Sequence, residues 1–170
     1  MRILITGTTG FVGHKLKASY TDAIAAPSLR NATQDMIKKI VEESEADVVI
    51  HTAAISDIGT CQKDPQSSYF ANVQIPLHLA AACKDRKLIC FSSDQVYSAC
   101  KEEGPYIEEV VKPGNIYAEH KLEMEERVLE LVPSAVMLRA EWMYDYVSPK
   151  PNYFLNVLHA SQQVSFSSRQ

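Results

Sequence analysis

The stretch RILITGTTGFVG, residues 2–13, joins a short run of aliphatic residues to three glycines spaced three residues apart. Residues 2–6 predict a buried strand, and residues 12–20 predict a helix. In such a strand–turn–helix unit the first glycine permits a tight turn, the second lets a diphosphate approach the backbone, and the third lets the helix pack against the strand. Unpaired N–H groups at the helix N-terminus favour an anion. The residues expected to hold the dinucleotide are Gly7, Thr9, Gly10, Phe11, Val12 and Gly13.

The same alternation of strand and helix continues along the chain. Short apolar runs predict strands, and between them apolar residues recur at spacings of three and four, which is typical of helices. Pro76 predicts a kink in one helix, and residues 98–114, rich in Gly and Pro, predict a long connection. The pattern predicts an α/β protein with a Rossmann-type doubly wound, mostly parallel sheet. The further strands are residues 22–26, 47–51, 87–92 and 135–139, and the further helices are residues 34–44, 65–83 and 117–131.

Composition excludes several classes of protein. The 170 residues carry 17 Lys and Arg against 21 Asp and Glu, which gives a net charge of -4 and disfavours nucleic-acid binding. The longest uncharged stretch, residues 65–83, is too polar to cross a bilayer, and the N-terminal apolar run is too short for a signal peptide. We therefore expect a cytoplasmic protein. The four cysteines show no C-x-x-C spacing, so we expect buried reduced thiols and no metal site.

The end of the second strand carries the signal for nucleotide preference. A dehydrogenase that prefers NAD usually has an acidic residue there, whereas this chain has Ser28 and Arg30. A hydroxyl and a guanidinium suit a 2′-phosphate, which favours NADP(H), with NAD(H) and a merely solvated Arg30 left open. After the third strand, Ala53 and Ala54 are small enough for a cofactor to lie against the sheet edge, although small residues also simply pack.

A Tyr followed four residues later by a Lys places both side chains on one helix face, where the ammonium can lower the phenol pKa. Three pairs have this spacing: residues 97 and 101, residues 117 and 121, and residues 146 and 150. Gly104 and Pro105 closely follow the first pair and Pro149 lies within the third, whereas Tyr117 and Lys121 begin a long helical pattern. Ser93 ends the fourth strand, at the edge where ligands of open α/β sheets bind, and could polarise a substrate carbonyl. We expect Ser93, Tyr117 and Lys121 to be catalytic.

With these motifs the chain resembles the extended short-chain dehydrogenases/reductases, and within them the dTDP-4-dehydrorhamnose reductase family. GTTGFVG resembles the family's phosphate turn, SSDQVY its strand-end segment and NIYAEHK its Tyr/Lys helix. The resemblance implies that Ser93 binds the keto oxygen, that Tyr117 supplies the proton and that Lys121 holds the nicotinamide ribose, while hydride from NADPH reduces the C4 ketone of a nucleotide-linked sugar. LRAEWMY resembles a segment near the sugar, and the substrate-binding residues implied are Asp94, Trp142 and Asn152.

The resemblance also implies a domain organisation. We expect residues 1–140 to form the NADP(H)-binding domain and residues 141–170 to begin an incomplete substrate-binding region, because members of the family continue further. A homodimer is a further expectation. Two alternatives stay open: a related sugar-nucleotide epimerase, and a non-enzymatic regulatory subunit similar to the β subunit of methionine adenosyltransferase, since a fold can keep such residues while its function changes. Dehydration is disfavoured, because Gln95 follows Asp94 where dehydratases have a second acid.

Overall fold

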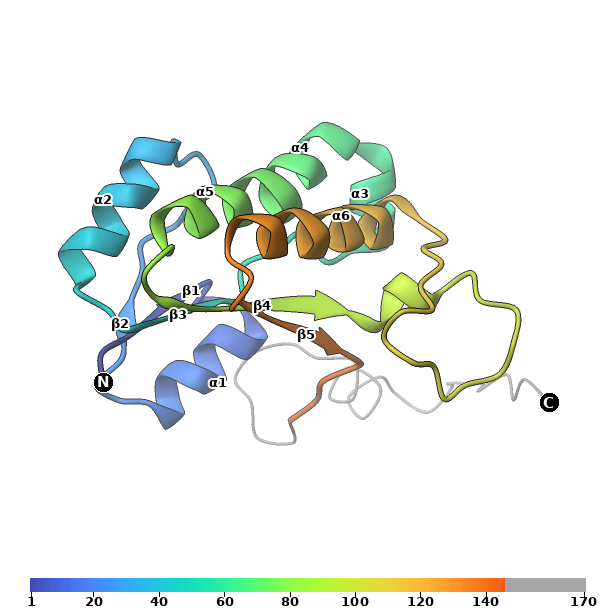
Figure 1. Ribbon diagram of the computed structural model, residues 1–170, viewed down its shortest axis with the longest axis horizontal. Coiled ribbons are helices and arrows are strands. Elements are labelled where there is room, and N and C mark those ends of the chain that lie inside the picture. The colour runs from blue at the N-terminus through green and yellow to red at the C-terminus, as the bar shows by residue number, and fades with distance from the viewer. Residues whose placement is uncertain (146–170) are drawn as a thin grey trace, which may run out of the picture.

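A five-stranded parallel sheet forms the centre of the molecule. The computed structural model describes residues 1–145, and within them the strands follow the order β2-β1-β3-β4-β5, with every neighbouring pair parallel (Figure 1). Each strand coincides with a predicted run to within two residues at either end. The strands are β1 (Ile3–Thr6), β2 (Ile24–Ala25), β3 (Val48–His51), β4 (Lys87–Ser93) and β5 (Val136–Ala140).

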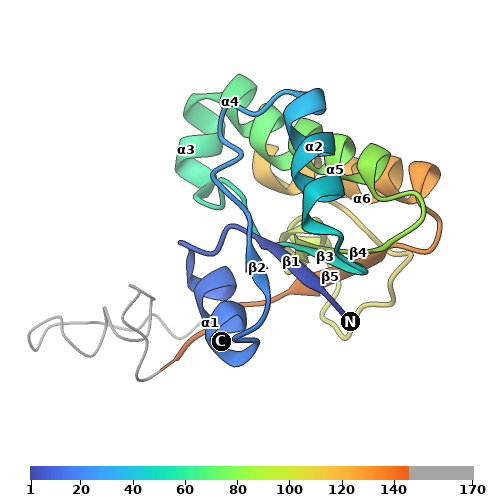
Figure 2. The same cartoon turned by 90° about the vertical axis from the view of Figure 1, so that its left-hand side faces the viewer.

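Helices cover both faces of this sheet, which confirms the doubly wound fold. Helix α1 (Phe11–Ser19) lies on one face, whereas α2 (Gln34–Ser44), α5 (Ile75–Ala82) and α6 (Ile116–Leu131) lie on the other (Figures 1 and 2). Shorter helical segments complete the described part of the chain: α3 (Ile58–Lys63), α4 (Pro65–Tyr69), the π-helical turn η1 (Phe70–Gln74) and the 3-10 helix η2 (Asp94–Tyr97).

The core has two parts because successive side chains of a strand point to opposite faces. Leu4, Val49 and Leu88 belong to the larger cluster, which packs against α2, α5 and α6. Ile5 and Ile50, with the opposite orientation, belong to a smaller cluster against which Leu16 of α1 packs. The strands are therefore covered on both sides, as their nearly continuous apolar sequences indicate.

Two local features differ from the sequence-based expectation. Helix α3 was not predicted; it has only six residues and begins where Asp57 accepts a hydrogen bond from the backbone N–H of Thr60 at 2.7 Å. The kink expected at Pro76 takes the form of the π-helical turn η1. A proline inside a helix cannot donate to the carbonyl four residues earlier, here that of Asn72, and its ring crowds that carbonyl, so a wider turn accommodates it.

The strand order creates a crevice at the carboxyl edge of the sheet. The chain leaves β1 towards α1 on one face, whereas it leaves β3 towards α3 and α4 on the opposite face (Figure 1). Because β1 and β3 are neighbours, the segments that follow them diverge and leave a space between them, which is where open α/β sheets bind ligands.

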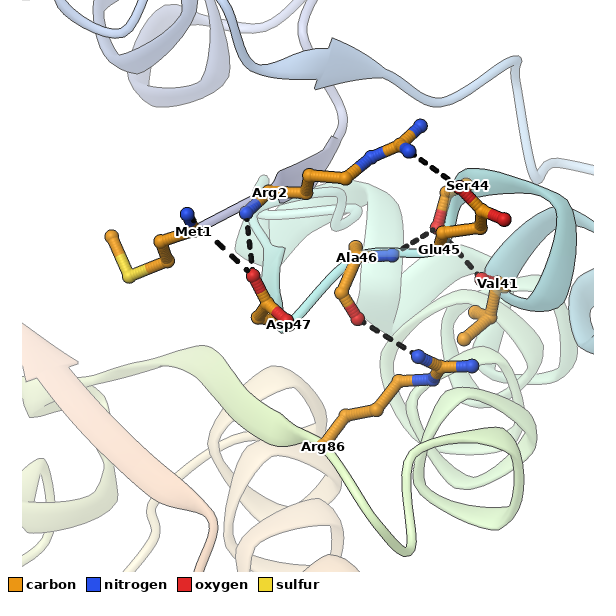
Figure 3. Close-up of polar contacts among 8 residues, drawn as sticks. All are labelled: Met1, Arg2, Val41, Ser44, Glu45, Ala46, Asp47 and Arg86. Atoms are coloured by element: carbon orange, nitrogen blue, oxygen red, sulfur yellow. Dashed lines mark hydrogen bonds and ion pairs between the residues drawn. The ribbon is translucent and has the colours of Figure 1, made fainter.

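The opposite edge of the sheet is closed by polar contacts around the turn from α2 to β3 (Figure 3). Glu45, the C-cap of α2, has a left-handed backbone with φ of 47°, and its carboxylate pairs with the Arg2 guanidinium at 2.5 Å. The backbone N–H of Arg2 donates to Asp47 at 2.7 Å, and Arg86 donates to the carbonyl of Ala46 at 2.9 Å. These contacts tie β1, α2 and β3 together far from the crevice.

Within residues 1–145, no helix combines the length and the apolar character needed to cross a membrane. The four cysteines carry free thiols, and Cys61, Cys83 and Cys90 are buried. The domain boundary expected after residue 140 stays a prediction, because residues 146–170 lie outside the described part of the chain.

Candidate active site

A cavity of about 870 Å³ lies over the carboxyl ends of β1, β2 and β3. Its volume is within the usual range of about 300–1,000 Å³ for small-molecule sites. No side chain among the described residues caps the first turn of α1, so the N–H groups of that turn face this edge of the sheet. The predicted cofactor residues that line the cavity are Gly7, Thr9, Gly10, Ser28, Arg30, Ala53 and Ala54.

The glycine turn has the close packing that its spacing predicted. Gly7 has a φ of +73°, and a Cβ there would lie 2.6 Å from the backbone nitrogen of Ala53. A Cβ on Gly13 would lie 2.3 Å from the carbonyl oxygen of Gly7. Gly13 lines neither cavity of this site; its contribution is that α1 can approach the end of β1 closely. A Cβ on Gly10, in contrast, would meet only the Gly7 carbonyl oxygen, at 3.3 Å.

The end of β2 contributes the polar wall of the same cavity. Arg30 is exposed, and its backbone N–H donates a hydrogen bond to the Ser28 hydroxyl at 3.5 Å. Asn31 lines the cavity beside them. Among residues 1–145 no carboxylate lines this cavity, and the cation of Arg30 fits a phosphate-bearing ligand.

A second cavity, of about 560 Å³, contains the predicted catalytic residues. Gly10, Thr52 and Ala54 line both cavities, so the two spaces adjoin above β1 and β3. A ligand could therefore extend from the glycine turn to the end of β4. The predicted residues that line the second cavity are Gly10, Phe11, Val12, Ala54, Ser93, Asp94, Tyr117, Lys121 and Trp142.

Ser93 and Tyr117 form the polar centre of the second cavity. Ser93 Oγ donates to the carboxylate of Asp94 at 3.0 Å and accepts from the backbone N–H of Gln95 at 3.2 Å. Burial raises the pKa of Tyr117, while its hydrogen bond with Ser93 acts in the opposite direction. The arrangement keeps the phenol protonated, as a proton donor requires, and brings it to the strand-end hydroxyl.

Lys121 differs from expectation in where its ammonium points. Nζ donates to the carbonyl oxygen of Phe91 at 2.6 Å and lies 6.0 Å from the centroid of the Tyr117 ring. The lowering of the Tyr117 pKa that we expected from Lys121 is therefore not found, because the ammonium is directed to the end of β4. Burial lowers the pKa of Lys121 itself to about 8.

His51 lies beneath this site at the end of β3. Its Nδ1 is 2.7 Å from the hydroxyl of Thr6, and its Nε2 is buried with no hydrogen-bond partner among the described residues. Burial, assisted by the charge of Lys121, lowers the pKa of His51 to about 3. The imidazole at the end of β3 is therefore neutral near pH 7 and adds no positive charge beside Lys121.

Of the three Tyr/Lys pairs with this spacing, the structure places one on a shared helix face. Tyr117 and Lys121 share the buried face of α6. Tyr97 ends η2, whereas Lys101 lies beyond it in the exposed connection, so these two are not on one helix. The pair at residues 146 and 150 lies outside the described residues, as does the predicted substrate residue Asn152.

The helical wall of the first cavity was not predicted from the sequence. Gln66, Ser67 and Phe70, from α4 and the start of η1, line it. Within η1, the amide of Asn72 is buried, and it accepts from the backbone N–H of Ile55 at 3.0 Å and donates to the Ile55 carbonyl at 2.9 Å. A helix from Pro65 was predicted. Which of its side chains line the cavity could not be predicted, because that depends on how the helix packs beside the sheet.

The predicted substrate residues have different positions in the second cavity. Asp94 lies beside Ser93 at its base. Trp142 lies at its rim, with 67% of its surface exposed. Arg139, which belongs to the segment expected near the sugar, lines neither cavity; it contacts α6 and the connection after β4 instead.

An open parallel sheet, a glycine turn at its crevice and a buried Tyr/Lys pair beside a strand-end serine define a Rossmann-type protein of the short-chain dehydrogenase/reductase class. The family described as RmlD substrate binding domain matches residues 1–166. The chain belongs to this family, which confirms the resemblance seen in its sequence.

The chain is similar to dTDP-4-dehydrorhamnose reductase of Mycolicibacterium smegmatis, with 32% identity over 152 residues, which cover 84% of this chain and 46% of that protein. Among solved structures it is similar to a dTDP-4-dehydrorhamnose reductase of Clostridium acetobutylicum, with 25% identity, a TM-score of 0.82, and coverage of 93% of this chain and 58% of that one. It is also similar to RMD of Pseudomonas aeruginosa complexed with NADPH, with 25% identity, a TM-score of 0.69, and coverage of 82% and 52%. The chain spans about half the length of the curated relatives it matches.

Proposed function

We propose that this chain is the NADP(H)-binding and proton-donating part of a reductase that converts the C4 ketone of a nucleotide-linked 4-keto-6-deoxy sugar to an alcohol, as in dTDP-L-rhamnose synthesis. One observation carries the proposal: Ser93, Tyr117 and Lys121 line a cavity that adjoins the glycine-turn cavity through Gly10. Relatives named as dTDP-4-dehydrorhamnose reductases support the substrate class.

The residues of the first cavity fit an NADP(H) molecule. The diphosphate would lie at Gly10 and the uncapped N-terminus of α1, where the backbone carries no side chain that would crowd it. The 2′-phosphate would be held by Ser28 and Arg30, and the small side chains of Ala53 and Ala54 would let the cofactor lie against the sheet edge. The NADPH bound to the Pseudomonas aeruginosa relative supports this cofactor.

The residues of the second cavity would handle the proton. When bound, the reduced nicotinamide supplies the hydride that forms the new C–H bond at C4 of the sugar. Ser93 Oγ would donate a hydrogen bond to the ketone oxygen and orient it. Tyr117 would transfer its phenolic proton to the same oxygen, and its raised pKa keeps that proton in place until charge develops there. Lys121 would hold the nicotinamide ribose.

The two alternatives are not favoured. The curated relatives reported above are named as reductases, and none of them is named as a regulatory subunit or an epimerase. A location in the cytoplasm and a homodimer remain predictions.

The proposal is tested by measuring NADPH binding and NADPH oxidation separately for the chain and for Tyr117→Phe. We expect both proteins to bind NADPH with similar affinity, because the phenol oxygen is remote from the phosphates. NADPH oxidation in the presence of dTDP-4-dehydrorhamnose should fall by about 100-fold or more in Tyr117→Phe, the size expected for loss of a proton donor. Equal turnover in the two proteins would remove Tyr117 from the reaction, and failure of the wild-type chain to bind NADPH would remove the cofactor.

A further inference from the structure

Helix α6 carries two Arg–Glu pairs in very different surroundings. Glu123 pairs with Arg127 on the outer face, where the side chains are 38% and 45% exposed. Glu125 pairs with Arg139 of β5 on the inner face, where the side chains are only 6% and 19% exposed. The inner pair is a fork: Arg139 Nε lies 3.0 and 3.1 Å from the two Glu125 oxygens, and Nη2 lies 2.6 Å from Oε2. Such a pair costs desolvation and fixes geometry.

Glu125 is the third of three side chains that attach α6 to the end of β4. Tyr117 lines the same cavity as Ser93, whose hydroxyl acts to lower the Tyr117 pKa. One turn later Lys121 donates to the carbonyl of Phe91, and another turn later Glu125 accepts from the hydroxyl of Ser92. Residues four apart share one helix face. The first two attachments are made by the predicted catalytic residues themselves, so the third bears on where those two side chains lie.

Arg139 extends the same attachment to the connection after β4. It lies opposite Ser92 in the parallel register, so both side chains reach Glu125. Its Nη1 donates to the phenol of Tyr97 and to the carbonyl of Glu108, each at 2.6 Å. The guanidinium also lies 5.2 Å from the centroid of the Tyr97 ring. One planar cation thus joins α6, β5, η2 and the long connection, which a lysine could not do.

We propose that Glu125 and Arg139 are positioning residues: the pair fixes how α6 lies on the end of β4, keeps Tyr117 in the cavity of Ser93 and Lys121 on the Phe91 carbonyl, and places a negative charge one helical turn from the Lys121 ammonium. The roles of Tyr117 and Lys121 rest on the proposed function. The inferred role of the pair is separate from it, because it concerns where those side chains lie and how they are charged.

The charge on Lys121 is set by groups from several elements. Burial lowers its pKa, whereas Cys90 of β4, Glu125 of its own helix and Cys61 of α3 act in the opposite direction. His51 of β3 also faces it and stays neutral, because burial lowers the pKa of that imidazole to about 3. Burial raises the pKa of the Cys90 thiol to about 12, so this thiol is neutral near pH 7. Glu125 is therefore the anion expected to hold the proton on Lys121.

The first test is an NMR titration of Lys121 in the chain without nucleotide, with the signal assigned by its absence from Lys121→Arg. Glu125→Gln keeps the shape of the side chain and removes its charge, so the titration midpoint of Lys121 should move downward. Glu125→Asp restores the charge and should move the midpoint back towards the wild-type value. Glu123→Gln, on the outer face of the same helix, is the matched control and should leave the midpoint unchanged. An unchanged midpoint in Glu125→Gln, or an equal fall in Glu123→Gln, would overturn the inference.

The second test measures the position of Tyr117 and decides the matter if Glu125→Gln does not fold. Arg139→Lys keeps a cation beside Glu125 but loses the fork, so Tyr117 should move away from the Ser93 hydroxyl that lowers its pKa, and the Tyr117 midpoint, read from 13Cζ-labelled tyrosine, should move upward. Arg127→Lys is the control. An unmoved Tyr117 in Arg139→Lys contradicts a positioning role. Because neither titration uses nucleotide, a chain that binds no NADPH would refute the proposed function and leave both results interpretable.

Discussion

Among single residues, Gly10 and Gly13 show how differently two glycines of one turn can be used. A methyl group on Gly13 would overlap the Gly7 carbonyl, whereas one on Gly10 would point into the space where we place the diphosphate. We therefore expect Gly10 to affect ligand binding, whereas Gly13 allows the close contact between helix and strand. Mutation can separate these two functions, because only one of the two methyl groups meets protein atoms closely.

Gly10→Ala should weaken nucleotide binding with little change in the free energy of unfolding, whereas Gly13→Ala should lower the free energy of unfolding. We expect Gly10→Ala to lower the free energy of unfolding by less than about 1 kcal/mol and to weaken NADPH binding about tenfold or more. Gly13→Ala should cost about 2 kcal/mol, because overpacking forces the backbone apart. Urea unfolding and NADPH fluorescence measure the two effects. A Gly13→Ala protein as stable as the wild type would show that α1 is not packed against β1 as closely as the structure has it.

Arg30 should decide between the two nicotinamide nucleotides. If its guanidinium binds the 2′-phosphate, Arg30→Ala should weaken NADPH binding about tenfold, the size of one charge-assisted hydrogen bond at an exposed site, and leave NADH binding nearly unchanged. Arg2→Ala, at the opposite edge of the sheet, controls for a general loss of positive charge. Equal losses for NADPH and NADH would mean that Arg30 does not distinguish the two nucleotides.

Among the secondary-structure elements, the turn from α2 to β3 contains a residue in an unfavourable conformation. Glu45 has a left-handed backbone, which costs a residue with a Cβ about 1 kcal/mol and costs glycine almost nothing. The ion pair of Glu45 with Arg2 is largely exposed, so it adds little stability to offset this. The conformation is kept because it ends α2 and turns the chain into β3.

Two substitutions at this position separate the backbone from the ion pair. Glu45→Ala removes the carboxylate and keeps the strain, whereas Glu45→Gly removes both. We expect Glu45→Gly to be more stable than Glu45→Ala by about 1 kcal/mol in urea unfolding. If the two variants unfold at the same urea concentration, the strain at residue 45 contributes nothing to stability.

The elements themselves could be predicted well because their sequences are locally consistent. The strands are continuous apolar runs, and Gln34–Ser44 was predicted with both of its ends correct, since Thr33 caps its start. Helix α3 was missed because six residues carry too little periodicity. The catalytic candidates were found from their spacing, but the contacts of Lys121 with Phe91 and of Arg139 with Glu125 were not, because they join segments far apart in the chain.

In the molecule as a whole, stability depends on pH through a histidine with no direct contact to solvent. His51 is neutral in the folded state because its pKa is lowered to about 3, whereas in the unfolded chain it titrates at its ordinary value of 6.5. Above 6.5 both states are neutral, and His51 causes no pH dependence. As the pH falls from 6.5 towards 3, the unfolded chain binds a proton that the folded protein does not, and the free energy of unfolding decreases.

The size of this effect follows from the two pKa values. Between about pH 7 and about pH 5.5, His51 should remove about 1 kcal/mol from the free energy of unfolding. In His51→Asn this part of the pH dependence should disappear, while the contribution of His78 and His120, whose pKa values are also lowered by burial, should remain. Urea unfolding at the two pH values gives the comparison. Parallel curves for the wild type and the variant would show that His51 is accessible to protons in the native state.

The divergence of the chain on either side of β1 and β3 has a consequence for how such proteins change over evolutionary time. The crevice at the carboxyl edge of the sheet arises from the order of the strands, so it depends on the topology more than on particular side chains. Substitution can therefore replace most of the sequence while the crevice persists. Descendants of one ancestor would then differ in the side chains that line the crevice long before they lose the crevice itself.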